Sequence, residues 1–357
     1  MTILRFLRKY REHGNYAYVT TRVRARRAEL QPRENYEKML MLSLPELSRT
    51  IGESSYRAEI EELAPRYGSV DLIEWATSLN LAHNFRQILG WCEGELQAMV
   101  ALYLRRWDVA NLKVILRGKS NGIPVQEILE DIVAAGEFSY EYLAALANIE
   151  NLADVIDNLS QTDYHSVIAS GRGEGGQLDL ASVENQLDKA YYANLFRVVT
   201  PTSPANLQFL NFLRHEVDVV NLRTLFKMKA EDLAAEQVLE NLVRGGIELP
   251  DADLRRLASA EGLDGLVTEL ASLPVYEQLR EAVESMGAAK DLSPVLSALD
   301  HYMLRFSAKL ASLYPLSALP VLAFIIHKRA EADNIRIIAR GLDRGLDHAT
   351  IRAMLRT

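Results

Sequence analysis

DVANLKVILR, at positions 108–117, is the first of three similar stretches in this chain. The second, DVVNLRTLFK, covers positions 218–227, and the third, EADNIRIIAR, covers positions 331–340. Each copy has ten positions. The first five hold an acid, two variable residues, an Asn, and either Leu or Ile. The last five hold a base, a variable residue, either Ile or Leu, another variable residue, and a second base. The copies begin 110 and then 113 residues apart. This regular spacing indicates an internal repeat of about 110 residues, which determines the architecture.

Composition and periodicity predict helices almost throughout the chain. Leu, Ala, Glu and Arg are abundant, and strict apolar–polar alternation is scarce. On a helix, the apolar residues of the first copy form one stripe that packs inward, namely Val109, Leu112, Ile115 and Leu116. The same places in the other copies hold Leu222, Leu225, Phe226, Ile335 and Ile338. We therefore expect an all-α fold.

The sequence around the three copies predicts larger units. A glycine-containing break and a new amphipathic segment follow each copy, with the breaks at 122–124, 246–248 and 345–347. Upstream, Tyr56 corresponds to Tyr164 and to Tyr276. We therefore expect three pseudo-symmetric helical-bundle repeats, at 1–121 with an N-terminal extension, 122–231 and 232–357.

The polar residues of the three copies are the candidate site residues. They are Asp108, Asn111, Lys113, Arg117, Asp218, Asn221, Arg223, Lys227, Glu331, Asn334, Arg336 and Arg340. An acid near the start of a helix and bases toward its end suit the helix dipole. Asn is a poor helix former, so a repeated Asn needs a partner such as a buried carbonyl. Two interpretations stay open: the motif fixes how each repeat closes on itself, or its charged ends face a shared cavity or partner.

The charge balance argues against a general affinity for nucleic acid or anionic membranes. The 357 residues carry 40 Lys and Arg against 48 Asp and Glu, a net charge of −8. One local basic cluster, Arg22, Arg24, Arg26 and Arg27, is either a solvated helix face or a set of partner contacts. The single cysteine, Cys92, excludes an intramolecular disulfide and a cysteine-based zinc site, and fits a reducing compartment.

We expect a cytoplasmic protein with no membrane span. Arg5, Arg8 and Lys9 interrupt the apolar residues at the start, which excludes a secretory signal there. The most apolar later run, 316–326, contains Pro320 and is about half the length that crosses a bilayer.

Searches for catalytic chemistry give no candidate. The tripeptide at 118–120, GKS, lacks the earlier glycine of a phosphate-binding loop, and Val219 stands where a zinc-protease helix beginning at His215 needs its second histidine. The glycine-rich stretch at 171–176 predicts a flexible linker, because no strand precedes it. We therefore expect no catalytic, cofactor-binding or metal-binding residues and no small-molecule substrate.

The three motif copies resemble the C subunit of archaeal and bacterial V/A-type ATPases, whose eukaryotic counterpart is the d subunit of V-type ATPases. Further similarities are YAY at 16–18 with RVRA at 22–25, YEKML at 36–40 leading to Tyr56, and, near the end, Pro315, Pro320, Leu322, Ile325 and KRAE at 328–331. The resemblance covers essentially the whole chain. One departure is the stretch before Tyr16, which is longer and more basic than the usual start of the family.

The resemblance implies an all-helical funnel of three repeats on the cytoplasmic face of a rotating membrane ring. Its hollow would receive the tip of the central stalk, with subunits of the D and F type as partners. The protein would pass torque during coupled proton or sodium transport and bind no nucleotide. Such docking surfaces use charge to set register, so Arg22, Arg24, Arg26 and Arg27 are candidate contacts.

Two other functions compete with this one. A generic helical-repeat scaffold would bind some other protein through a concave surface. Its solenoid units, however, span about 34 to 47 residues, whereas the repeat of this chain spans about 110. An all-helical enzyme with unrecognised chemistry is the second alternative. Recovery with stalk and ring subunits separates the adaptor from the scaffold, and a nucleotide-dependent thermal shift would favour the enzyme.

Overall fold

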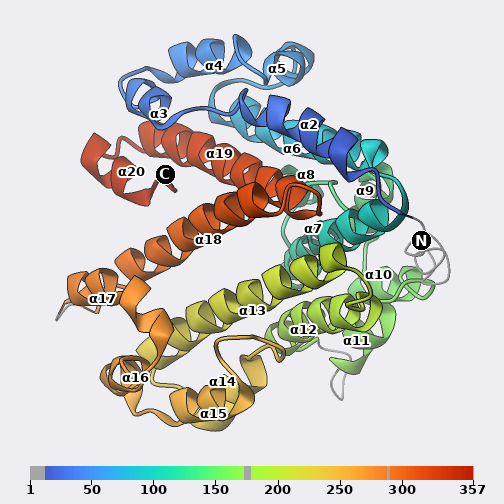
Figure 1. Ribbon diagram of the computed structural model, residues 1–357. Helices are drawn as coiled ribbons and strands as arrows, with labels where there is room; N and C mark the ends of the chain where they lie inside the picture. Colours follow the sequence, from blue (N-terminus) through green and yellow to red (C-terminus); the bar gives the residue numbers. More distant parts are fainter. Residues whose placement is uncertain (1–12, 173–177, 288–289, 357) are drawn as a thin grey trace. The chain divides into compact units, whose positions relative to one another are not determined.

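The computed structural model describes residues 13–172, 178–287 and 290–356, and within those ranges the chain is helical (Figure 1). No β-strand forms there, and an isolated bridge joins Arg172 to Leu178. The predicted all-α class is confirmed. Positions 173–176 of the predicted linker, and the first ten residues that we expect to lack a secretory signal, lie outside the described residues.

The chain divides into two compact units, Met1–Val198 with Phe324–Leu355, and Val199–Ala323 with Arg356–Thr357. The first holds α2 (Tyr16–Arg27), α3 (Arg33–Met39), α4 (Leu44–Gly52), α5 (Arg57–Leu63), α6 (Ser69–Trp91), α7 (Gly94–Ser120), α8 (Val125–Glu130), α9 (Tyr140–Asn148), α10 (Leu152–Asn158), α11 (His165–Ser170), α12 (Leu180–Val198) and α20 (His348–Met354). The second holds α13 (Pro204–Ala230), α14 (Ala235–Asn241), α15 (Asp251–Ser259), α16 (Gly262–Leu270), η1 (Pro274–Gln278), α17 (Arg280–Met286) and α18 (Ser293–Leu313). Helix α19 (Leu319–Asp343) begins in the second unit and continues in the first.

The three motif copies lie in the long helices α7, α13 and α19. Their predicted apolar stripe is confirmed, because Leu112, Leu222 and Ile335 have no exposed surface. In the first unit, the α19 stripe packs with the N-terminal helices in a core that includes Tyr36, Leu47 and Tyr56. In the second unit, the α13 stripe packs with residues of α14 to α18. Burial of its apolar stripe stabilises each long helix, because the helix propensity of the residues alone gives an isolated helix little stability.

Local sequence sets where several helices begin. Ser43 and Glu46 form a capping box at α4, in which the Ser43 backbone N–H donates to Glu46 Oε2 at 2.9 Å. Ser203 caps α13 just before Pro204, and Asp347 caps α20 by accepting from the Thr350 backbone N–H at 2.9 Å. Each cap supplies an acceptor for an N–H group that the first helical turn leaves unpaired.

The three motif helices end in the same way. A residue with positive φ follows each of them, namely Gly122 (65°), Asp232 (52°) and Gly345 (65°). The next backbone N–H then donates to a carbonyl five residues earlier, at 2.9 Å from Ile123, 3.1 Å from Leu233 and 2.9 Å from Leu346. The predicted break at 246–248 is therefore wrong as the counterpart of Gly122, because that place belongs to Asp232. The glycine rule missed it, since Asp also tolerates this left-handed conformation.

Candidate functional site

The motif acids of α7 and α13 hold the backbone of the loop that follows. Asp108 accepts from the backbone N–H groups of Glu137 at 2.8 Å and Phe138 at 3.0 Å. Asp218 accepts in the same way from the backbone N–H groups of Ile247 at 2.9 Å, Glu248 at 2.8 Å and Leu249 at 3.2 Å. These donors lie 29, 30 and 31 residues after Asp218, and the donors to Asp108 lie 29 and 30 residues after it. Both carboxylates are buried, so these donors replace the water that burial removes.

A glycine makes room for each of these carboxylates. A Cβ atom on Gly136 would overlap the side chain of Asp108, and one on Gly246 would overlap that of Asp218. Each glycine stands 28 residues after its acid. Gly246 is therefore the counterpart of Gly136, and close approach to a carboxylate is the reason for a glycine at both positions.

The motif asparagines of these two helices make matching pairs of bonds. Asn111 donates to the carbonyl of Val133 at 2.8 Å and accepts from its N–H at 2.9 Å. Asn221 does both with Val243, each at 2.8 Å. We call the acid and asparagine bonds of each helix its clasp. Both asparagines therefore bond one backbone unit, that of the half-buried Val133 and that of the buried Val243.

The third copy has a different set of partners. Glu331 accepts from the backbone N–H of Gln31 at 2.5 Å and from the hydroxyl of Tyr56 at 2.7 Å. Burial and the nearby Glu331 raise the pKa of Tyr36, whereas a hydrogen bond with the Asn334 side chain lowers it. The α19 motif therefore binds residues of an N-terminal segment, which precedes it in the chain.

The motif bases of each copy, except Lys227, form ion pairs or hydrogen bonds with a second long helix, which is α12, α18 or α6. Lys113 pairs with Asp188 of α12 at 2.6 Å, and Arg117 pairs with Glu184 at 2.7 Å. Arg223 pairs with Asp300 of α18 at 2.6 Å. In α19, Arg336 donates to Thr77 and Ser78 of α6, and Arg340 pairs with Glu74.

One motif base differs from the others. Lys227 is exposed, and among the described residues it has no ion-pair partner. Asp300 takes the place of Asp188, so the place of Glu184 falls on Leu296, which has no charge. Apart from Lys227, the bases support the interpretation that the motif closes each bundle on itself.

Sequence reasoning missed a further base three residues before each acid. Arg105 pairs with Asp163 at 2.8 Å, and His215 lies 3.3 Å from Glu248. Lys328 pairs with Glu331 at 2.6 Å, and its ammonium lies 4.0 Å from the ring centre of Tyr56. Extending the motif alignment by three positions would have found them, because each copy carries Arg, His or Lys there.

Burial shifts the pKa of two groups in these clusters. Desolvation raises the pKa of the Asp108 carboxyl to about 7, against the opposing effects of the Phe138 hydrogen bond and Arg105. Desolvation also lowers the pKa of the Lys328 ammonium, although Glu331 favours its charged form.

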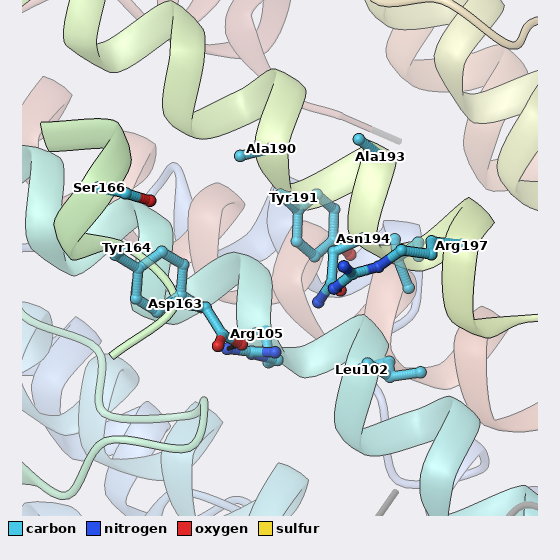
Figure 2. A pocket seen from close by; sticks show the side chains of 11 residues that line it. Leu102, Arg105, Asp163, Tyr164, Ser166, Ala190, Tyr191, Ala193, Asn194 and Arg197 are labelled. Carbon is cyan, nitrogen blue, oxygen red and sulfur yellow. Dashed lines mark hydrogen bonds and ion pairs between the residues drawn. The ribbon is translucent and has the colours of Figure 1, made fainter. Parts of the chain in front are cut away.

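A cleft of about 480 Å³ lies beside Arg105, between α7, α11 and α12 (Figure 2). Arg105 and Asp163 meet at one side of it, and Asn194 and Arg197 come from α12. The cleft volume falls within the range of about 300 to 1,000 Å³ that ligand sites occupy. It is the candidate binding site.

The four predicted contact arginines lie on α2 or at its end, on two faces. The Arg22 guanidinium stacks 4.2 Å from the ring centre of Trp91, and Arg26 donates to Gln87 at 2.7 Å and pairs with Glu29 at 3.0 Å. Arg24 and Arg27 are exposed, and neither has a hydrogen-bond or ion-pair partner among the described residues. The structure therefore separates two arginines that hold α2 in place from two that face solvent.

Comparison with known proteins identifies the family. The model of the family described as ATP synthase (C/AC39) subunit matches residues 19–354. The chain belongs to the ATP synthase C/AC39 family. A relative from Methanococcoides burtonii is 37% identical over 96% of this chain and 94% of its own length. Relatives from Methanosarcina acetivorans and Haloferax volcanii are 36% and 34% identical, over 98% and 96% of this chain and 94% and 97% of their own lengths.

Each of these three relatives is named as the C subunit of an A-type ATP synthase. The resemblance expected from the motif copies is therefore confirmed for this member of the C/AC39 family. Within the described ranges, no three His, Cys, Asp or Glu side chains gather as a metal ion would require. No described helix of this family member is both long and apolar enough to cross a membrane.

Proposed function

We propose that this chain is the non-catalytic central-stalk adaptor of a rotary V/A-type ATPase or ATP synthase. In this role it links central-stalk subunits of the D and F type to the membrane rotor ring. It lies on the cytoplasmic face as a peripheral part of the complex and transmits torque for coupled proton or sodium transport. The carrying observation is the match, over 96% and 98% of this chain, to two relatives named as C subunits of A-type ATP synthases.

The clasps support this proposal in physical terms. A part that transmits torque must resist twisting within itself, and a bundle held only by apolar contacts lets helices slide. In α7 and α13, buried carboxylate and amide groups fix the following loop to the helix. Ion pairs such as Lys113 with Asp188 and Arg223 with Asp300 tie the same helices to a second long helix. Buried polar networks whose members are all paired rigidify the structure around them.

We also propose that the fold is a funnel of three repeats, each led by one motif helix. The predicted ranges 1–121, 122–231 and 232–357 each end with or shortly after a motif helix. The clasps of α7 and α13, however, reach segments that follow the motif. We therefore propose that a repeat begins at its motif helix, and that α19 and α20 form the third repeat together with α3 to α6, with which they share a core.

The exposed arginines of α2 are the proposed partner contacts. Arg24 and Arg27 have unengaged charges on one face, whereas Arg22 and Arg26 are held by α6 and nearby residues. Positive charge that the chain does not neutralise itself is available to a partner, and it sets the orientation in which an acidic surface docks.

Charge reversal on α2 tests these contacts. Replacing Arg24 and Arg27 together by Glu should weaken assembly at physiological salt. Replacing the exposed Arg49 and Arg66 together by Glu is the control, because it makes the same change in net charge elsewhere on the surface. Assembly that is unchanged by the α2 replacements would remove this face from the proposed contacts.

Affinity purification tests the proposed function. A tagged full-length chain is purified from gently solubilised membranes of its native cells, and co-purifying proteins are identified by mass spectrometry. We expect stalk and rotor-ring subunits, and we expect high salt to release the chain, because charged interfaces weaken as salt screens them. Recovery only from the soluble fraction with unrelated partners would contradict the proposal and favour a generic scaffold.

A further inference from the structure

The cleft beside Arg105 has a largely apolar lining, and most of its polar groups can donate hydrogen bonds. Arg105 and Tyr164 are each only 6% exposed, and apart from their interaction with each other neither Arg105 Nη1 nor the Tyr164 hydroxyl has a hydrogen-bond partner in the described part of the chain. Arg197 is exposed at the rim and donates to Asn194 at 2.8 Å. The acid in the lining, Asp163, already pairs with Arg105. Buried polar atoms without partners are costly, so this wall favours an incoming acceptor.

Charge leads to the same conclusion. Asp163 and Glu137, at 2.8 Å and 3.7 Å, offset the charge of Arg105. Arg197, at the rim, has no carboxylate partner among the described residues, so no ion pair offsets its positive charge. Arginine binds carboxylates well because its planar group offers several donors. An anionic acceptor is therefore favoured over a cation.

The corresponding place beside α13 is filled by the protein itself. Asp188 and Asp300 bind equivalent bases, so Ala190 and Asn194 of α12 correspond to Tyr302 and Phe306 of α18. The Phe306 ring lies 4.7 Å from the imidazole of His215, the counterpart of Arg105, and 5.4 Å from the ring of Tyr302. The small residues of α12 thus leave a cleft beside Arg105, whereas the aromatic rings of α18 fill the corresponding space beside His215.

We propose that the cleft of α7, α11 and α12 receives an acidic side chain from a peptide segment of a neighbouring stalk subunit. The carboxylate pairs with Arg197 at the rim and accepts from the donors of Arg105 and Tyr164. This inference rests on the proposed function, because it takes the occupant from the same complex. A polypeptide fits because Tyr164, Tyr191 and Leu102 give the cleft an apolar wall for the rest of the side chain.

Two variants test the cleft without altering the buried Arg105. Ala190→Tyr with Asn194→Phe copies the filling of α18, and Arg197→Glu reverses the rim charge. The matched control is Gln186→Phe, which adds a ring to an exposed position of α12 outside the cleft. Circular dichroism and melting temperature confirm folding, and Arg197→Glu covers the case in which the filled variant misfolds. We expect each cleft variant to lower recovery of stalk subunits at least about tenfold relative to the control.

Photocrosslinking identifies the occupant directly. Ser166 is exposed at the cleft, and the one native cysteine, Cys92, is 1% exposed, so Ser166→Cys accepts a thiol-reactive photocrosslinker selectively. A crosslink in the assembled complex to an Asp- or Glu-containing stalk segment supports the proposal. A crosslink only to lipid, or full stalk recovery by both cleft variants, overturns it. Failure of the wild-type chain to recover any stalk subunit would instead contradict the proposed function.

Discussion

Helices α7 and α13 hold the loops that follow them with the same kinds of bond, yet the space beside the two helices is filled differently. Each has an Asp and an Asn bound to backbone groups at matching distances along the chain. Beside α13, Tyr302 and Phe306 cover the base, whereas Ala190 and Asn194 leave a cleft beside α7. The buried polar contacts therefore define the bundle, and the side chains of the facing helix can vary for binding.

The largest effect is expected from crowding the clasp of α13. In Gly246→Ala the new methyl group overlaps the Asp218 carboxylate, so the loop must move and up to three N–H bonds are lost. We expect a loss of more than about 4 kcal/mol in unfolding free energy, or no folded protein. Gly136→Ala should behave alike. Gly265→Ala is the control, because a methyl group there would make only ordinary van der Waals contacts. Equal stability of all three variants would show that the clasps are dispensable.

The clasp of α7 should make stability depend on pH. Burial raises the pKa of Asp108 from its ordinary value of 3.8 to about 7, so the folded chain holds this proton more tightly than the unfolded chain. Its contribution is complete below about pH 4 and is lost as pH rises toward 7, on the order of 4 kcal/mol in total. Urea unfolding between pH 4 and pH 8 measures it, and Asp108→Asn should remove this component. An identical pH profile in that variant would refute the assignment to Asp108.

Removing the asparagines tests whether the two clasps are equivalent. Asn221→Ala leaves both the N–H and the C=O of the buried Val243 unpaired. Asn111→Ala leaves only the N–H of the half-buried Val133 unpaired, because the Val133 carbonyl also accepts from the Ala135 N–H at 2.8 Å. We expect losses of about 2–3 kcal/mol for Asn221→Ala and about 1–2 kcal/mol for Asn111→Ala, with faster hydrogen exchange at those valines. A larger loss for Asn111→Ala than for Asn221→Ala would contradict this comparison.

Two further asparagines calibrate that measurement. Asn334→Ala in α19 should also lower the unfolding free energy, by about 1–3 kcal/mol, because Asn334 is buried and hydrogen-bonds the Tyr36 side chain. Asn241→Ala serves as the control, because the Asn241 amide makes only an exposed bond to a carbonyl of its own helix.

The smallest effect concerns the ends of the motif helices. Asp232 has a φ of 52° where the other two helices have glycine. Asp232→Gly should raise the unfolding free energy by about 0.5–1 kcal/mol, because glycine adopts this conformation without a Cβ penalty. The reciprocal change, Gly122→Asp, should lower it by a similar amount. Melting temperatures that move in the opposite directions would contradict the equivalence of the two helix ends.

The helical class, the buried stripes and the family could be predicted because they depend on local periodicity and on a pattern repeated in sequence. The partners of the motif could not, because contacts such as Asn111 with Val133 join residues whose packing the one-dimensional pattern does not encode. Gly246 was assigned to a helix end, since sequence alone does not separate a glycine needed for positive φ from one needed for close approach. The cleft was missed because it arises from the small size of Ala190 and Asn194 relative to the aromatic residues of α18.

Coupling measurements on native membranes test the central claim most directly. The chain is removed from the complex, and ATP hydrolysis and ion transport are measured before and after purified chain is added back. A non-catalytic torque-transmitting adaptor predicts that hydrolysis continues without the chain, that ATP-driven ion transport stops, and that the added chain restores transport. Ion transport that continues without the chain would contradict the account.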